Sequence, residues 1–598
     1  MTTTLGQLLI HSAMPVGHKF ENTTVDKNEI VKGLSKLAIA DPKAYVKIVT
    51  ELKQLGDEFA TYEGISVGLD DIEPNYVERD KIVADISAQM KKATDVQKKR
   101  EILLKAQDQL ETLTKQHKGD MSLMAKSGGR GNIPQLMKTV TSPALATDWS
   151  GAVVPWFVKK SYAEGLSPSE LWVTGAEARK NTIAGVTSVV EPGAMGKLLV
   201  RTMENQVIAS DDCGTTNGIL LPTDSPDIVD RYIAKTIDKF PHNTLITSQV
   251  ADYLQKHFKQ VLVRSPMTCE IHQGVCSKCF GLNTKGNPGK LGTNIGMQAA
   301  QAMSEPLVQA MLSSKHAASI AKGATKEPRG FSGFKRLTTV PEAFAGAAVL
   351  AKKYGTIDSI ESAPQGGHFI SVDGIEHHIP PDLDILVKKH EIVEAGDRLS
   401  SGISKPNEVM ELKGLGVGRQ HYVDVLHKVF KDSITDIDRR HLEVLAKAQL
   451  SHAEVVDDPH GDLLRGDIIH FNRLKERLQD ETKEINTVSA EGKMLSKSYN
   501  EFMAGTTVTP SVMRSLEDRG IHKVEIAINP PKLLFVMKPI THAPLLNPDW
   551  LARMAHMYLK KTILDASAYG ETSNIHGYHP VPAYVVGTTF GEGNKGAY

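Results

Sequence analysis

The stretch from Gly292 to Gly323, GTNIGMQAAQAMSEPLVQAMLSSKHAASIAKG, decides how the rest of the chain is interpreted. Residues 297–304 are good helix formers, and residues 307–318 can form a second helix. Pro306 lies between them and lacks the N–H that a continuous helix needs, so it should interrupt or kink the helix. The sequence therefore predicts two helical arms that meet at a hinge.

The second arm lies in a basic neighbourhood. Residues 315–336 contain one acid, Glu327, and six cationic residues: Lys315, Lys322, Lys326, Arg329, Lys335 and Arg336. Such an excess of positive charge suits a site that meets phosphates. The alternative that the pattern leaves open is an ordinary helical hairpin with a solvated basic side.

All four cysteines of the chain form one candidate metal site: Cys213, Cys269, Cys276 and Cys279. The last three have the spacing C-x6-C-x2-C, and Gly274 eases the turn before the second of them. Four thiolates suit tetrahedral Zn²⁺ and leave no open coordination position, so the metal should be structural. Two alternatives are that His272 replaces one cysteine, or that the thiols are free or paired as disulfides.

Composition indicates a large protein outside the membrane. The chain has 598 residues, with 70 Lys and Arg against 70 Asp and Glu, so its net charge gives no sign of nucleic acid. Its length suggests about three or four domains. We expect a cytoplasmic protein, because no charged leader and no apolar run long enough to span a bilayer occur in the sequence. DNA, if bound, must be held by local patches or by partner subunits.

The stretch from Gly292 to Gly323 resembles the trigger loop of the β′ subunit of multisubunit RNA polymerases. In that family the element reads approximately IGxIAAQSxGEPGTQLTMxTFHxGG. The residues that fall on this pattern without a gap are Ile295, Gly296, Ala299, Ala300, Gln301, Glu305, Pro306, Gln309 and His316. The resemblance implies that the chain takes part in RNA synthesis.

The resemblance also implies roles for individual side chains of the trigger loop. His316 would meet the leaving pyrophosphate as hydrogen-bond donor or general acid, and Gln309 matches the family's glutamine. Leu312 can press on the nucleotide base. Ser313 stands where the bacterial sequence has arginine and cannot supply a guanidinium, but Lys315 can offer a point charge nearby.

Two further elements of the family precede this stretch in the expected order. Residues 124–131, MAKSGGRG, resemble the F-loop, and residues 162–200 resemble the bridge helix. Gly185, Pro192 and Gly193 should interrupt that helix and bend it, although two short helices joined by a loop remain the alternative. The positions expected to meet nucleic acid are Arg130, Arg179, Lys180, Thr187 and Gly193.

The resemblance extends over most of the chain and implies a multidomain α+β fold, helix-rich, within the double-psi-barrel polymerase assembly. Residues 77–118 lack Gly and Pro and predict a long helical hairpin. Residues 369–379 predict a β-hairpin with Asp373 and Gly374 at its turn. The expected regions are 1–123, funnel and rim helices; 124–205, F-loop and bridge helix; 206–290, zinc module; 291–345, trigger loop; 346–530, jaw and clamp-proximal region; and 531–598, switch region and C-terminal clamp segment.

The sequence lacks one part of the family's chemistry, the Asp-rich loop of the NADFDGD type that holds catalytic Mg²⁺. We therefore expect a partner chain to supply the magnesium-binding aspartates for nucleotidyl transfer. Because the chain opens where the family continues past that loop, it resembles the C-terminal half of a split β′ subunit. The short link after the trigger loop favours the giant-bacteriophage type, which would place the protein in the host cytoplasm or a phage-nucleus compartment.

The implied partners are an N-terminal β′ half, β-like subunits, an initiation factor, DNA template, RNA and nucleoside triphosphates. Two other classes remain open at this point. One is a zinc-stabilised structural or nucleic-acid-binding subunit without a catalytic role, which the substitutions at Ser313 and Lys315 allow. The other is a self-sufficient nucleic-acid enzyme or binding module.

Overall fold

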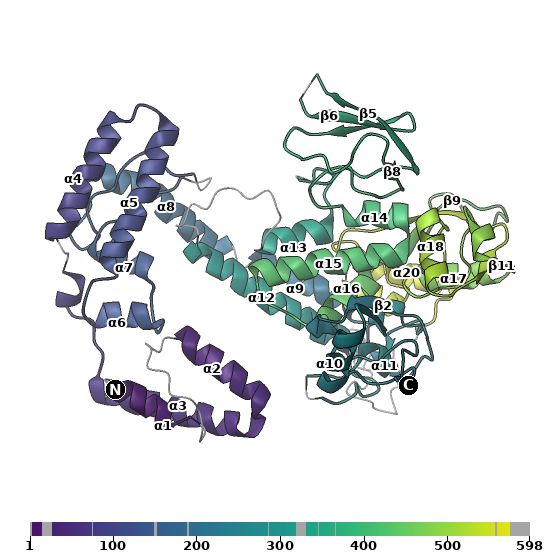
Figure 1. Ribbon diagram of the computed structural model, residues 1–598, viewed down its shortest axis with the longest axis horizontal. Coiled ribbons are helices and arrows are strands. Elements are labelled where there is room, and N and C mark those ends of the chain that lie inside the picture. Colours follow the sequence, from purple (N-terminus) through teal and green to yellow (C-terminus); the bar gives the residue numbers. More distant parts are fainter. Residues whose placement is uncertain are drawn as a thin grey trace. The chain divides into compact units, whose positions relative to one another are not determined.

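The structure is a computed structural model that describes residues 3–14, 27–73, 76–148, 152–187, 190–284, 286–317, 330–344, 346–364, 366–556 and 559–573. The chain divides into two compact units, one of residues 1–186 with 315–323 and one of residues 187–314 with 324–598, so the last three residues of the helix over 295–317 fall in the first unit. Figure 1 shows the elements of both units.

The first unit is built from helices. They are α1 (Leu5–Ser12), α2 (Lys27–Ala40), α3 (Pro42–Glu63), α4 (Tyr76–Lys92), α5 (Val96–Thr114), α6 (Asp120–Ser127), α7 (Ile133–Val140) and α8 (Pro168–Thr187). α4 and α5 form the predicted helical hairpin and pack together through a core that includes Ile86, Leu103 and Leu110. Met137 of α7 joins the same core. The prediction of a hairpin over residues 77–118 is confirmed.

Local capping signals fix where these helices begin. Asp41 accepts hydrogen bonds from the first turn of α3, and Pro42 occupies its first position. Before α8, the Ser167 N–H donates to the Glu170 carboxylate at 2.9 Å while the Glu170 N–H donates to Ser167 Oγ at 3.5 Å. This reciprocal capping box satisfies two backbone donors that the helix itself leaves without partners.

The second unit mixes helices with small sheets. Its helices are α9 (Val190–Met203), α10 (Ser248–His257), α11 (Ser277–Phe280), α12 (Ile295–Ala317), α13 (Gly330–Thr339), α14 (Pro406–Lys413), α15 (Leu415–Ser433), α16 (Arg439–Gln449), α17 (Phe471–Gln479), α18 (Pro510–Asp518), α19 (Trp550–His556) and α20 (Leu559–Tyr569). Its strands are β1 (Ile208–Ser210), β2 (Ile219–Pro222), β3 (Gln260–Val263), β4 (Val275–Cys276), β5 (Gly355–Ser362), β6 (His368–Val372), β7 (Ile375–Ile379), β8 (Ile392–Val393), β9 (His452–Asp457), β10 (Ile468–His470), β11 (Thr482–Asn486), β12 (Lys523–Ala527) and β13 (Lys532–Val536). This composition confirms a helix-rich α+β chain.

The sheets are short and mostly antiparallel. The largest has the strand order β7-β6-β5-β8, and a second has the order β10-β9-β13. β6 and β7 pair around Asp373 and Gly374, whose φ angles are +46° and +77°. Positive φ at both central residues is what a two-residue type I′ turn requires, so the predicted β-hairpin is confirmed.

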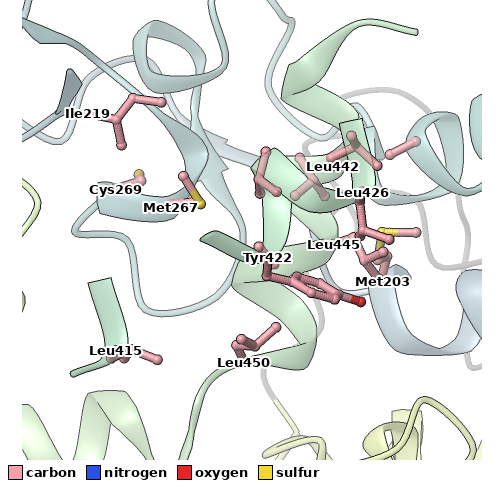
Figure 2. Close-up of a cluster of buried hydrophobic side chains, with 14 of the residues drawn as sticks. Met203, Ile219, Met267, Cys269, Leu415, Tyr422, Leu426, Leu442, Leu445 and Leu450 are labelled. Carbon is pink, nitrogen blue, oxygen red and sulfur yellow. The ribbon is translucent and has the colours of Figure 1, made fainter. Parts of the chain in front are cut away.

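The second unit has one large hydrophobic core and smaller separate ones, among them a cluster of side chains from β5, β6 and β7. Figure 2 shows side chains of the large core, among them Met203 of α9, Tyr422 and Leu426 of α15, and Leu445 of α16. The Tyr422 hydroxyl donates to Gln449 Oε1 at 2.7 Å, so this buried polar group is satisfied. The end of α9 and the helices α15 and α16 therefore share one interior.

The prediction that Pro306 divides the Gly292–Gly323 stretch into two helices is wrong. α12 is continuous from Ile295 to Ala317, with Pro306 inside it. Proline removes one backbone hydrogen bond, but apolar side chains are buried on both sides of it, including Ala300, Met303 and Leu307. Burial thus outweighs the local defect. Residues 318–329, which would complete the predicted second arm and its turn, lie outside the described residues.

The described residues of the predicted bridge helix, 162–200, include α8 and most of α9. Gly185 lies inside α8, and Pro192 and Gly193 lie near the start of α9. Contrary to the prediction, each of these residues lies within a helix. Proline is tolerated in the first turn of a helix, because the backbone N–H groups there have no helical acceptor. Residues 188 and 189, between the two helices, lie outside the described residues. None of the described helices is long and apolar enough to cross a membrane.

Candidate functional site

The four cysteines converge in one small module of the second unit. β1 and β4 pair in parallel, so the loop that follows β1 and carries Cys213 begins beside Cys276. Cys276 caps α11, because its Sγ accepts the Cys279 N–H at 3.4 Å. Cys269 follows the single 3₁₀ turn of residues 266–268. Sheet pairing and two tight turns thus place all four thiols around one point.

Gly274 allows the turn between the second and third cysteines. Its φ is +85°, a left-handed value that favours glycine. A Cβ at this position would lie 2.3 Å from the carbonyl oxygen of Val207, which is backbone and cannot move aside. The glycine predicted to ease this turn is therefore required by both conformation and space.

The sulfur atoms have the spacing of a tetrahedral metal site. All four Sγ atoms lie within 4.8 Å of one another, and Cys213 Sγ lies 3.7 Å from Cys279 Sγ and 3.8 Å from Cys269 Sγ. Four sulfurs at about 2.3 Å from zinc form a tetrahedron with edges of about 3.8 Å. The donor set and its dimensions therefore fit zinc.

Two of the alternatives for these cysteines are not supported. No disulfide joins the four residues, so the disulfide alternative is wrong, whereas the alternative of free thiols without a metal stays open. His272 is outside the cluster and 61% exposed, with its nearest charged partner being Glu476 at 3.6 Å. The alternative in which His272 replaces one cysteine therefore has no support in the geometry.

The thiols of the module and Arg264 shift one another's pKa values. Burial raises the pKa of Cys269 and Cys279, whereas hydrogen bonds from the other three thiols lower the pKa of Cys213. Burial alone would lower the pKa of the Arg264 guanidinium, but the Cys279 thiolate and Asp212 raise it above its ordinary value. The raised pKa values of Cys269 and Cys279 favour the neutral thiols, so all four groups would be thiolates only with a cation among them.

The start of α12 packs closely on the end of α9. A Cβ on Gly296 would lie 1.8 Å from the carbonyl oxygen of Met203, and the Gly296 N–H donates to the Gln206 carbonyl at 2.8 Å. Further along, a Cβ on Gly196 would lie 3.2 Å from Ser304 Cβ. The predicted bridge-helix end and the predicted trigger-loop start are therefore joined through glycines.

The predicted trigger-loop residues lie in the second half of α12. Gln309 is exposed, beyond the buried Leu307. Leu312, Lys315 and His316 lie in the last turns of the helix, and their side chains are outside the described part of the structure. Their assigned roles stay predictions.

The predicted nucleic-acid residues are at accessible positions where the structure describes them. In the first unit, Arg179 of α8 and Arg130 after α6 are exposed, and Lys180 is half-buried. In the second unit, Gly193 is exposed on α9. Thr187 ends α8, and its side chain is outside the described part.

Sequence reasoning missed the polar residues that surround the thiols. Arg264 contacts three of the four sulfurs, and Asn243 and Asp212 hold its guanidinium. From α16, Lys447 Nζ donates to the carbonyls of residues 269, 271 and 274 at 3.3, 3.2 and 2.9 Å. The available signal was a charged residue, Arg264, directly after the apolar strand VLV and five residues before Cys269.

Comparison with known proteins places the relatives of this chain among the large subunits of multisubunit RNA polymerases. No family model matches the chain. The DNA-directed RNA polymerase subunit beta′ of Bifidobacterium adolescentis is 26% identical over 79% of this chain and 38% of its own length. Those of Moorella thermoacetica and Leifsonia xyli are 25% and 28% identical, over 78% and 79% of this chain and 44% and 40% of their own lengths.

These matches confirm the resemblance found in the sequence: the chain is homologous to RNA polymerase β′ subunits. It spans about two fifths of the length of these relatives.

Proposed function

We propose that this chain is a C-terminal part of a β′-type subunit of a DNA-directed RNA polymerase. The observation that carries the proposal is the similarity to β′ subunits over 79% of the chain. The packing of α9 on α12 supports it, because a bridge helix and a trigger loop must act on the same nucleotide. The reaction is nucleotidyl transfer, in which an RNA 3′ oxygen attacks the α-phosphate of an incoming nucleotide.

The trigger-loop role falls to the second half of α12. Its first half is held by buried residues such as Ala299, Met303 and Leu307, whereas Gln309 is exposed. A helix anchored at one end can move its other end, which would carry His316 to the pyrophosphate. Leu312 and Lys315 would meet the base and the phosphates of the same nucleotide.

The bridge-helix role falls to α8 and α9. Arg179 and Lys180 of α8 present cations that can contact the phosphates of template or transcript. Thr187, the last residue of α8, and Gly193, near the start of α9, would lie beside the growing base pair. Arg130 of the F-loop adds a further exposed cation.

The metals of the proposed enzyme have separate origins. One structural zinc would be bound by the four cysteines, tying the end of α9 to the start of α12. The catalytic Mg²⁺ would be bound by aspartates of a partner chain. When bound, Mg²⁺ stabilises the attacking and leaving oxygens of the transfer.

The assembly we propose is a cytoplasmic polymerase with an N-terminal β′ half, β-like subunits and an initiation factor, acting on DNA, RNA and nucleoside triphosphates. A split β′ subunit of giant-bacteriophage type accounts for the short link of residues 318–329 between the trigger helix and α13. A zinc-stabilised subunit without a catalytic role is the competing function.

The test is co-purification and reconstitution. Tagged chain should retain polymerase subunits from expressing cells, and the reconstituted complex should extend RNA on a preassembled DNA–RNA scaffold. RNA synthesis by the purified chain alone would contradict the need for partner chains. A complex that extends RNA equally well without this chain would leave the structural role as the better account.

A further inference from the structure

A buried arginine lies against the thiol cluster. Arg264 follows β3, and its side chain has 0% exposure to solvent. Its Nη2 donates to the sulfurs of Cys213, Cys276 and Cys279 at 3.2, 3.4 and 3.3 Å. One nitrogen thus contacts three of the four sulfurs.

The guanidinium is clamped on its far side. Arg264 Nη1 donates to Asn243 Oδ1 at 2.6 Å and pairs with Asp212 Oδ1 at 2.7 Å. Asp212 is itself held by Lys278 Nζ at 2.9 Å and by Asn243 Nδ2 at 3.0 Å. Because the guanidinium is planar and these contacts fix one edge, Nη2 has little freedom to leave the sulfurs.

The charge of the proposed metal site calls for such a group. Four thiolates around one divalent cation carry two net negative charges, and burial of uncompensated charge is costly. The guanidinium of Arg264 contacts the sulfurs directly. The other cation described near the module, the ammonium of Lys447, donates to three backbone carbonyls instead. Hydrogen bonds from a fixed cation lower the energy of the thiolates and of the metal complex that they form.

We propose that Arg264 is the counter-ion of the four-thiolate centre and sets how long the module retains its metal. This inference rests on the proposed zinc site. Groups around metal ligands commonly change metal affinity by about 10–100-fold when they are removed. Arg264→Gln should therefore lose zinc faster by a factor of about 10–100, and Arg264→Lys, which keeps a charge but cannot span three sulfurs, should fall between it and wild type.

The experiment measures zinc release from the full chain. Zinc-loaded protein is mixed with excess EDTA, and the zinc that remains bound is measured over time. The matched control is Arg231→Lys, because Arg231 is another buried arginine of this unit but bonds Glu443 at 2.6 and 2.8 Å rather than sulfur. The control should release zinc at the wild-type rate.

A second readout separates charge from general destabilisation. In chain loaded with Co²⁺, loss of hydrogen bonds to sulfur should move the sulfur-to-cobalt charge-transfer band to lower energy in Arg264→Gln and leave it in place in Arg231→Lys. Unchanged release and an unchanged band in Arg264→Gln would overturn the proposal, as would equal acceleration in the control. A wild-type chain that binds neither metal would instead contradict the zinc site itself.

Discussion

At the scale of single residues, the four thiols make the most specific prediction. Cys276→Ser should bind well below one zinc per chain, because a neutral hydroxyl is a poor substitute for a thiolate at a tetrahedral zinc. Metal analysis of purified protein measures this directly. Ser277→Ala, a change at the neighbouring buried residue, is the control and should keep its zinc. Full zinc occupancy in Cys276→Ser would count against the site.

A buried carboxyl makes a second residue-scale prediction. Glu204 has 0% side-chain exposure, and burial raises the pKa of its carboxyl to about 7, although Arg201 at 3.2 Å opposes the shift. Asp549 acts in the same direction as burial. Between the unfolded value of 4.5 and about 7, the folded state binds more protons than the unfolded state, so stability falls as the pH rises.

Glu204→Gln should remove this pH dependence, because glutamine stays neutral. The variant should gain about 2–3 kcal/mol relative to wild type between pH 5 and pH 8. Denaturant unfolding at several pH values measures the difference. Parallel stability curves for the two proteins would show that Glu204 does not titrate in this way.

The residue scale also shows which parts of the site the sequence could predict. The cysteine spacing and Gly274 predicted the thiol cluster, because metal geometry depends on ligand type and local turns. Arg264 was missed because its partners, Asn243 and Asp212, lie 21 and 52 positions before it, and only the fold brings them together. Long-range ion pairs leave no periodic signal in a sequence.

At the scale of elements, the contact between α9 and α12 can be tested through its glycine. Gly296→Ala would place a Cβ 1.8 Å from a backbone oxygen of α9, so one helix must shift. We expect a loss of about 1–3 kcal/mol in the free energy of unfolding, the usual cost of overpacking. Chemical denaturation at low protein concentration measures it.

The control for this prediction is Gly193→Ala, in α9, the helix that Gly296 of α12 contacts. A Cβ at Gly193 has no atom within 4 Å, and alanine favours a helix by up to about 1 kcal/mol over glycine. The control should be as stable as wild type or more stable. A Gly296→Ala protein of equal stability would mean that α9 and α12 do not approach this closely.

The elements that the sequence predicted correctly are those set by local signals. The α4–α5 hairpin follows from an unbroken helical period, and the β6–β7 hairpin follows from Asp373 and Gly374. The prediction at Pro306 was wrong because buried side chains before and after it hold α12 as one helix. Local rules predict that proline breaks a helix. Whether it does depends on the tertiary packing of the helix, which the sequence does not show.

At the scale of the whole molecule, exposed apolar side chains predict dependence on partners. Leu171, Trp172 and Val186 of α8 are 62, 82 and 72% exposed. Exposed apolar groups of this size mark surfaces that other proteins cover. We expect the isolated chain to self-associate or precipitate as its concentration rises.

Light scattering across a concentration series tests this expectation. Trp172→Glu should reduce association, because a charge in place of the exposed indole opposes burial against a second molecule. Co-expression with partner subunits should yield a defined complex in its place. A monodisperse monomer at high concentration would contradict the prediction.

The central claim is that α12 acts in nucleotide addition, and His316 tests it most directly. The measurement is single-nucleotide addition by the reconstituted polymerase on a preassembled scaffold, followed by rapid quench at saturating nucleotide. His316→Ala should slow addition by about 10²–10⁴-fold while scaffold binding is retained. His460→Ala, at an exposed histidine of the second unit, should keep the wild-type rate.

His316→Gln separates the two possible roles, because glutamine donates a hydrogen bond but transfers no proton. Near-full activity would identify His316 as a positioning group, and a loss equal to that of alanine would identify it as the general acid. The account predicts a slowed rate for His316→Ala in either case. An unchanged rate of addition for both variants would contradict it.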